Sequence, residues 1–141
     1  PEEGSVLDSL AWILYKQGRL NDEVGPDGRP SPGAVALLAR ASTSMRGSEN
    51  PVILDHYGDA LWSAGKTDQA RQAWTQARQA VKNRLQMLRL ANTNAPPSRA
   101  IQRDETLLAQ IAAKLDALDA GRQPTLAEQP GVQSPASPAG K

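Results

Sequence analysis

The sequence predicts an all-α fold: two similar helix pairs, a further helix that caps them, and a C-terminal tail. The 141-residue chain has no Phe and no Cys, and it is rich in Ala, Leu, Gln and Arg, which favour helices. Its apolar residues recur at steps of three and four, the period of an α-helix. Two stretches, residues 7–18 and 54–65, are also similar to each other.

The first helix pair is predicted at residues 4–17 and 34–44. Gly18 follows the first of these helices and can adopt the left-handed conformation that ends many helices. Residues 24–33 hold three prolines and three glycines. An irregular loop is expected there, and no strand is predicted anywhere in the chain.

The second pair is predicted at residues 52–64 and 67–90. Gly65 separates its helices, and Thr67 is expected to cap the second one. The apolar stripe of this long fourth helix consists of Ala70, Trp74, Ala77, Val81, Leu85 and Leu88.

A fifth helix is predicted at residues 99–120, after two prolines that break the chain. Ser98 is its expected N-cap and Gly121 its expected stop. Residues 122–141 are mostly Gln, Pro, Ser, Ala and Gly. With so few apolar side chains they are predicted to form a disordered tail.

The two helix pairs look like copies of one unit. Residues 7–18 align without a gap to residues 54–65, and both stretches begin with Leu-Asp and end with Gly. Ala11 and Gly58 occupy the same place in the two copies, where a small residue lets two helices approach closely. The partner helices match as well, with Ala34, Leu38 and Ala41 corresponding to Ala70, Trp74 and Ala77.

This pattern resembles the tetratricopeptide repeat (TPR), a helix–turn–helix unit of about 34 residues whose copies stack into an α-solenoid. The second copy fits the pattern without a gap, whereas the first carries the insertion at 24–33. The resemblance implies TPR-type helix pairs in residues 1–95, a C-terminal capping helix in 96–121 and a disordered tail in 122–141.

The resemblance also implies that the chain is the C-terminal portion of a longer protein. Pro1 occupies the position of the proline that closes a repeat in this family, so a further repeat is expected upstream. Residues 7–12 and 50–62 resemble the C-terminal repeats of long bacterial TPR proteins of the cell envelope, which implies an envelope location. No apolar run approaches the ~20 residues of a membrane helix, so no transmembrane segment is expected.

In TPR proteins the first helix of each pair lines a concave groove that binds partner proteins. The groove residues implied here are Asp8, Trp12, Tyr15, Lys16, Asp55, His56, Asp59 and Trp62. Tryptophan and tyrosine would anchor a partner segment, and the carboxylates would favour a basic or amide-rich one. Packing of the two tryptophans against neighbouring helices is an equally good interpretation.

Asp55, His56 and Asp59 also raise the possibility of a metal site, since imidazole and carboxylate are metal ligands. The chain has no second His and no Cys. A solvated helix face is therefore the preferred interpretation, with neither metal nor cofactor expected. No catalytic set or phosphate-binding loop is found, so the sequence predicts a protein-binding scaffold rather than an enzyme with a small-molecule substrate.

The alternative is an accessory binder of nucleic acid or an anionic surface through the fourth helix. Residues 61–98 hold six basic residues and one acidic residue, whereas residues 1–60 hold nine acidic and five basic ones. Such a helix could bind phosphates. A solvated convex surface is the preferred interpretation, so nucleic acid is the less favoured partner. A second route for the scaffold is docking on a larger assembly through the 24–33 insertion or the long fourth helix. The insertion is either such a docking element or a variable loop.

Overall fold

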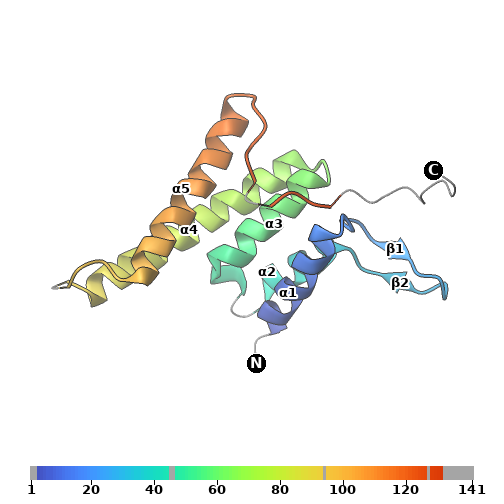
Figure 1. The fold of residues 1–141 in the computed structure, drawn as a ribbon, viewed down its shortest axis with the longest axis horizontal. Coiled ribbons are helices and arrows are strands. Elements are labelled where there is room, and N and C mark those ends of the chain that lie inside the picture. The colour runs from blue at the N-terminus through green and yellow to red at the C-terminus, as the bar shows by residue number, and fades with distance from the viewer. Residues whose placement is uncertain (1–2, 45–46, 94, 127, 132–141) are drawn as a thin grey trace, which may run out of the picture.

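The chain forms an all-α structure, as the sequence predicts. The computed structural model describes residues 3–44, 47–93, 95–126 and 128–131 (Figure 1). Its helices are α1 (Glu3–Lys16), α2 (Ala34–Thr43), α3 (Pro51–Ser63), α4 (Thr67–Ala91) and α5 (Arg99–Asp119), with a short 3-10 helix η1 (Gly47–Glu49) before α3. No helix in the described part of the chain is long and apolar enough to cross a membrane.

The ends of the helices follow the predicted signals with one exception. Gly18, Gly65 and Gly121 have φ of 75°, 81° and 68°, in the left-handed region, each just after a helix. The Ser98 hydroxyl accepts a hydrogen bond from the Ile101 amide and caps α5. The prediction that Thr67 caps α4 is wrong, because Thr67 is the first helical residue.

The 24–33 insertion, together with Glu23, forms a small β-hairpin, which corrects the prediction of a strandless chain. Strand β1 (Glu23–Val24) pairs antiparallel with β2 (Pro30–Ser31). A turn containing Gly28 connects the strands, and the hairpin projects away from the helices (Figure 1). The Asp22 carboxylate closes its base by accepting a hydrogen bond from the Gly33 amide, at 2.9 Å.

Each helix packs against the next one along the chain, and equivalent residues of the two second helices, α2 and α4, are buried alike. One core cluster joins α1 and α2, and a second joins α3, α4 and α5. Fully buried residues occupy the matching positions of the partner helices: Ala34, Leu38 and Ala41 in α2, and Ala70, Trp74 and Ala77 in α4.

The predicted close approach of two helices occurs at Gly58. A Cβ atom on this residue would lie 2.3 Å from two atoms of the Trp74 indole ring. Only glycine therefore lets Trp74, which is fully buried, lie flat against α3.

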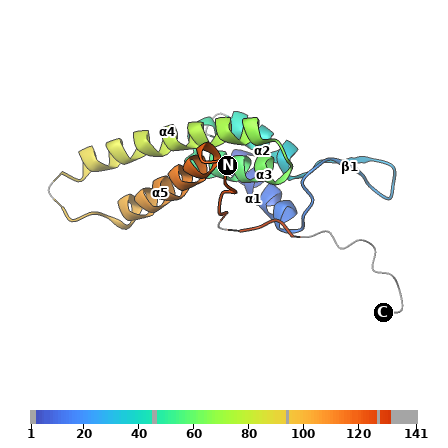
Figure 2. The same cartoon turned by 90° about the horizontal axis from the view of Figure 1, so that it is seen from above.

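The long α4 pairs with α5 in an antiparallel hairpin that extends beyond the other helices (Figure 2). Arg84 binds Asp104 of α5 through two hydrogen bonds of 2.6 and 2.7 Å, and the Asp104 side chain is almost fully buried. This two-point contact joins the two helices.

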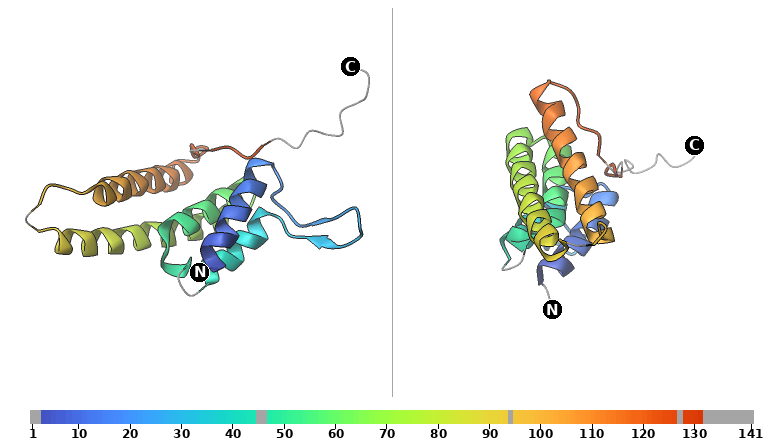
Figure 3. Two further views of the ribbon diagram at one scale, coloured as in Figure 1. Left: turned by 60° about the horizontal axis from the view of Figure 1, so that its bottom comes forward. Right: turned by 90° about the vertical axis from the view of Figure 1, so that its left-hand side faces the viewer.

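The segment after α5 differs from the predicted disordered tail. Residues 122–126 and 128–131, called the strap below, run back from the end of α5 past α3 to the end of α1 (Figures 1 and 3). Pro124 and Leu126 are buried, and Leu126 belongs to the core cluster of α3, α4 and α5. Residues 132–141 lie outside the described residues.

Candidate functional site

The predicted groove residues of α1 and α3 lie together on one side of the molecule, called the α1–α3 face below. Three rings form its centre. Trp12 stacks on His56, with ring centroids 3.8 Å apart and planes 15° apart. Its other neighbour in the stack is Tyr15, at 4.4 Å and 7°. The stack joins the first helix of one pair to the first helix of the next.

A short polar contact fixes the orientation of the His56 ring. Its Nδ1 atom lies 2.7 Å from Oδ1 of Asp8, and both side chains are mostly buried. Asp8 and Trp12 are one turn apart on α1, so the same helix holds His56 by its edge and by its face. Asp8 is therefore engaged within the fold.

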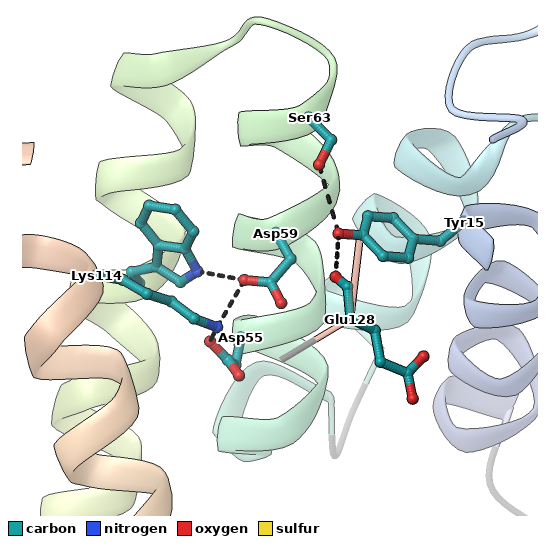
Figure 4. Close-up of polar contacts among 7 residues, drawn as sticks. Tyr15, Asp55, Asp59, Ser63, Lys114 and Glu128 are labelled. Carbon is teal, nitrogen blue, oxygen red and sulfur yellow. Dashed lines mark hydrogen bonds and ion pairs between the residues drawn. The ribbon is translucent and has the colours of Figure 1, made fainter. Parts of the chain in front are cut away.

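Asp55 and Asp59 do not lie on a solvated surface, which corrects the sequence interpretation. Lys114 of α5 lies across them and donates to Oδ1 of Asp55 at 2.8 Å and to Oδ1 of Asp59 at 2.7 Å (Figure 4). Asp55, Asp59 and Lys114 are 7%, 2% and 3% exposed, respectively. A charged cluster therefore lies buried between α3 and α5.

The indole of Trp74 completes this cluster. Its Nε1 donates to Asp59 Oδ1 at 3.1 Å, and Lys114 Nζ lies 5.6 Å from the centre of the ring, in cation–π range. Burial raises the pKa of Asp59 to about 6, and Asp55 adds to this effect while Lys114 and Trp74 oppose it. Burial alone would lower the pKa of Lys114, but the two carboxylates outweigh burial and raise it. The lysine therefore stays an ammonium ion that links two helices.

Tyr15 connects the aromatic stack to the strap. Its hydroxyl donates to the main-chain oxygen of Glu128 at 2.9 Å and lies 3.4 Å from the Ser63 hydroxyl (Figure 4). Burial is the main cause that raises its pKa to about 12. At the same end of α1, a Cβ atom on Gly131 would lie 2.2 Å from the Lys16 carbonyl oxygen, so the strap backbone touches α1.

The two remaining predicted residues lie at the margins. The Lys16 side chain is exposed beside the end of the strap. Trp62 is half-buried and packs against Trp74, with ring centroids 6.4 Å apart, so it contributes to the core beneath α3. Trp12 contacts neighbouring rings as well, so both tryptophans make packing contacts within the fold while staying partly exposed.

The possible metal ligands Asp55, His56 and Asp59 are held by other side chains of the fold. Among the described residues, no group of three or more His, Asp and Glu side chains could hold a metal ion. His56 is held by Asp8, while Asp55 and Asp59 bind Lys114. These three residues therefore do not converge on one point.

Part of the basic charge of α4 is neutralised within the α4–α5 hairpin. Three of its basic residues form ion pairs with carboxylates of α5: Arg71 with Asp119, Arg84 with Asp104 and Arg89 with Glu105. These pairs weaken the case for a phosphate-binding helix.

Two groups on this face were missed by sequence reasoning. Lys114 lies next to the apolar stripe of α5. A basic residue beside buried positions was the available signal for an ion pair with acidic residues of another helix. The strap carried only a weak signal, the pair Pro124 and Leu126 in a polar segment. Comparison with known proteins assigns no family, since no protein-family model, no curated protein and no solved structure matches the chain.

Proposed function

We propose that the chain is a protein-binding scaffold of the TPR kind, and that its α1–α3 face binds an extended segment of a partner protein. The partner takes the place of the strap. The proposal rests on the equivalence of the two helix pairs and on the way in which the strap is held.

The matching helix ends and the matching burial of the two second helices support a repeat architecture. Both first helices end at a left-handed glycine, and both second helices bury the same small–large–small stripe. Helix pairs that are equivalent in sequence and in packing are the units of an α-solenoid. Such solenoids present the first helices of successive pairs side by side, as α1 and α3 are here.

The observation that carries the proposal is the hydrogen bond from Tyr15 to the Glu128 carbonyl oxygen. The acceptor is a main-chain atom, which every extended polypeptide offers at the same place. Tyrosine next to stacked tryptophan is also the kind of rigid aromatic surface that contributes most to binding energy at interfaces. A segment of another protein can therefore accept the same hydrogen bond from the Tyr15 hydroxyl.

The charges on this face define the kind of segment that fits. Asp8, Asp55 and Asp59 are engaged by His56 or Lys114, so they do not select a basic partner as the sequence alone suggests. The strap presents a proline and a leucine two positions apart, both buried. The expected ligand is a segment with apolar anchors such as proline and leucine, and with a main-chain carbonyl that can accept the hydrogen bond from Tyr15.

The test is a pull-down from a cell lysate with four forms of the chain. These are the full chain, a chain that ends at Gly121, the same truncated chain with Trp12→Ala and Tyr15→Phe, and a truncated control with Gln72→Ala on α4. The truncated chain and its control are expected to retain a protein that the full chain retains weakly and the aromatic variant loses. Equal capture by the truncated chain and its aromatic variant would refute the proposal. Release of all captured material by moderate salt would favour the basic surface of α4.

A further inference from the structure

The side of α1 that points away from the strap exposes a stripe of large apolar side chains. Val6, Leu10 and Ile13 are 64%, 47% and 51% exposed. Their spacing of four and three places them in one row, and at about 100° per residue this row lies opposite Asp8, Trp12 and Tyr15. The stripe is thus a second surface, separate from the α1–α3 face.

The equivalent stripe on α3 is covered. When the gap-free alignment is extended by one residue, Val6, Leu10 and Ile13 correspond to Ile53, Tyr57 and Ala60. Ile53 is 3% exposed, Ala60 is fully buried, and Tyr57 is partly buried. Ala60 belongs to the core cluster of α1 and α2, and Val35 of α2 packs against both clusters. The helix that covers this side of α3 is therefore α2.

The other end of the helical array has no such stripe. Among the described residues the exposed large apolar side chains are Val6, Leu10, Ile13, Val24, Val52, Met87 and Leu90, and none of them belongs to α5. In the described part of the chain, large apolar side chains are thus exposed on α1, at one end of the array, but not on α5, at the other end. This asymmetry argues against head-to-tail stacking of two copies through α5.

We infer that the Val6–Leu10–Ile13 stripe is the docking surface for a helix of the α2 kind, part of a further helix pair placed before α1 in a longer polypeptide. The required chemistry follows from α2 itself, whose buried residues are all alanine or leucine and whose Val35 packs against both core clusters. A polar helix would leave the three apolar side chains in contact with water or with unpaired polar groups. The new interface continues the α2–α3 interface by one repeat.

The experiment uses the absence of cysteine, because one introduced thiol reports the burial of one position. Leu10→Cys is made in the full chain and in an extended chain in which a copy of residues 1–50 is placed before Gly4. In the extended chain the copied α2 then precedes α1 as α2 precedes α3. Gln72→Cys, at an exposed position of α4, is the control thiol.

The Leu10→Cys thiol is expected to react with a disulfide reagent at least ~10-fold more slowly in the extended chain. The control thiol should react at the same rate in both chains. Val35→Asp in the added copy alone should restore fast reaction at position 10. An unchanged rate at position 10 in a folded extended chain would overturn the inference. Protection in the unextended chain that grows with protein concentration would also overturn it, because the occupant would then be a second copy.

Discussion

Replacing Lys114 by Met is expected to destabilise the fold by about 3–5 kcal/mol near neutral pH. The substitution keeps the length of the side chain and suits the neighbouring apolar stripe of α5. It removes the cation that binds Asp55 and Asp59, which are 7% and 2% exposed, and leaves two carboxylates buried together. Breaking a buried pair from one side costs more than the pair itself contributes, because the remaining charge stays desolvated.

The pH dependence of this loss follows from the shifted pKa values. The pKa of Asp59 is raised from 3.8 to about 6, mainly by burial. The folded protein thus holds this proton more tightly than the unfolded chain, so ionisation of Asp59 destabilises the fold as pH rises from about 4 to about 6. A shift of about two units corresponds to on the order of 3 kcal/mol. Lys114 contributes in the alkaline range. Because its pKa is raised in the folded protein, its charge stabilises the fold below pH 10.5, and this contribution is lost as the pH rises through the pKa of the folded state.

In the Lys114→Met protein the carboxylates can be relieved only by protonation. The loss of stability should therefore be larger at about pH 8 than at about pH 5. Adding Asp59→Asn should recover part of it at about pH 8. Urea unfolding followed by far-UV circular dichroism measures these differences, with Lys82→Met at an exposed position of α4 as the control, expected within about 0.5 kcal/mol of the unmodified chain. A loss under about 1 kcal/mol at about pH 8, or an equal loss at both pH values, would refute the assignment of a buried ion cluster.

Three further results are expected. Gly58→Ala should destabilise the fold by about 1–3 kcal/mol in urea unfolding, because the added methyl group meets the indole of Trp74. An unfolding midpoint equal to that of the unmodified chain would show that the two helices can move apart. Absorbance titration of the Tyr57→Phe protein should give one tyrosine, Tyr15, with a pKa of about 12, and a midpoint near 10 would mean that its hydroxyl is solvated. Arg84→Lys should cost about 1–3 kcal/mol, since lysine cannot make the two-point contact with the buried carboxylate of α5, and thermal unfolding measures it.

The helices and their ends were predictable from the sequence because they depend on local signals. Apolar spacing gave all five helices to within one or two residues at each end. Gly18 and Gly65 marked the turns, since a left-handed residue is required there. The exception at Thr67 arose because a threonine next to a helix start can be either the cap or the first helical residue.

The composition of the α1–α3 face was predictable, but its contacts were not. Shared positions on two first helices placed Trp12 and His56 on one surface, and the structure brings them into contact. The burial of Asp55 and Asp59 depends on where α5 crosses α3, and no local pattern encodes that crossing. The strap was missed for the same reason, because a segment with two apolar anchors becomes ordered only on a surface that the rest of the fold provides.

The central claim is that the α1–α3 face binds an extended polypeptide segment through its main chain. The most direct measurement is a titration of a labelled peptide of residues 122–131 into the chain that ends at Gly121, after circular dichroism has shown that this chain is folded. Saturable binding is predicted, together with weaker binding by the Tyr15→Phe protein and by a peptide with Leu126→Asp. The full chain should bind the peptide less well, because its own strap competes. No saturable binding by the folded truncated chain, or equal binding by the full chain, would contradict the account.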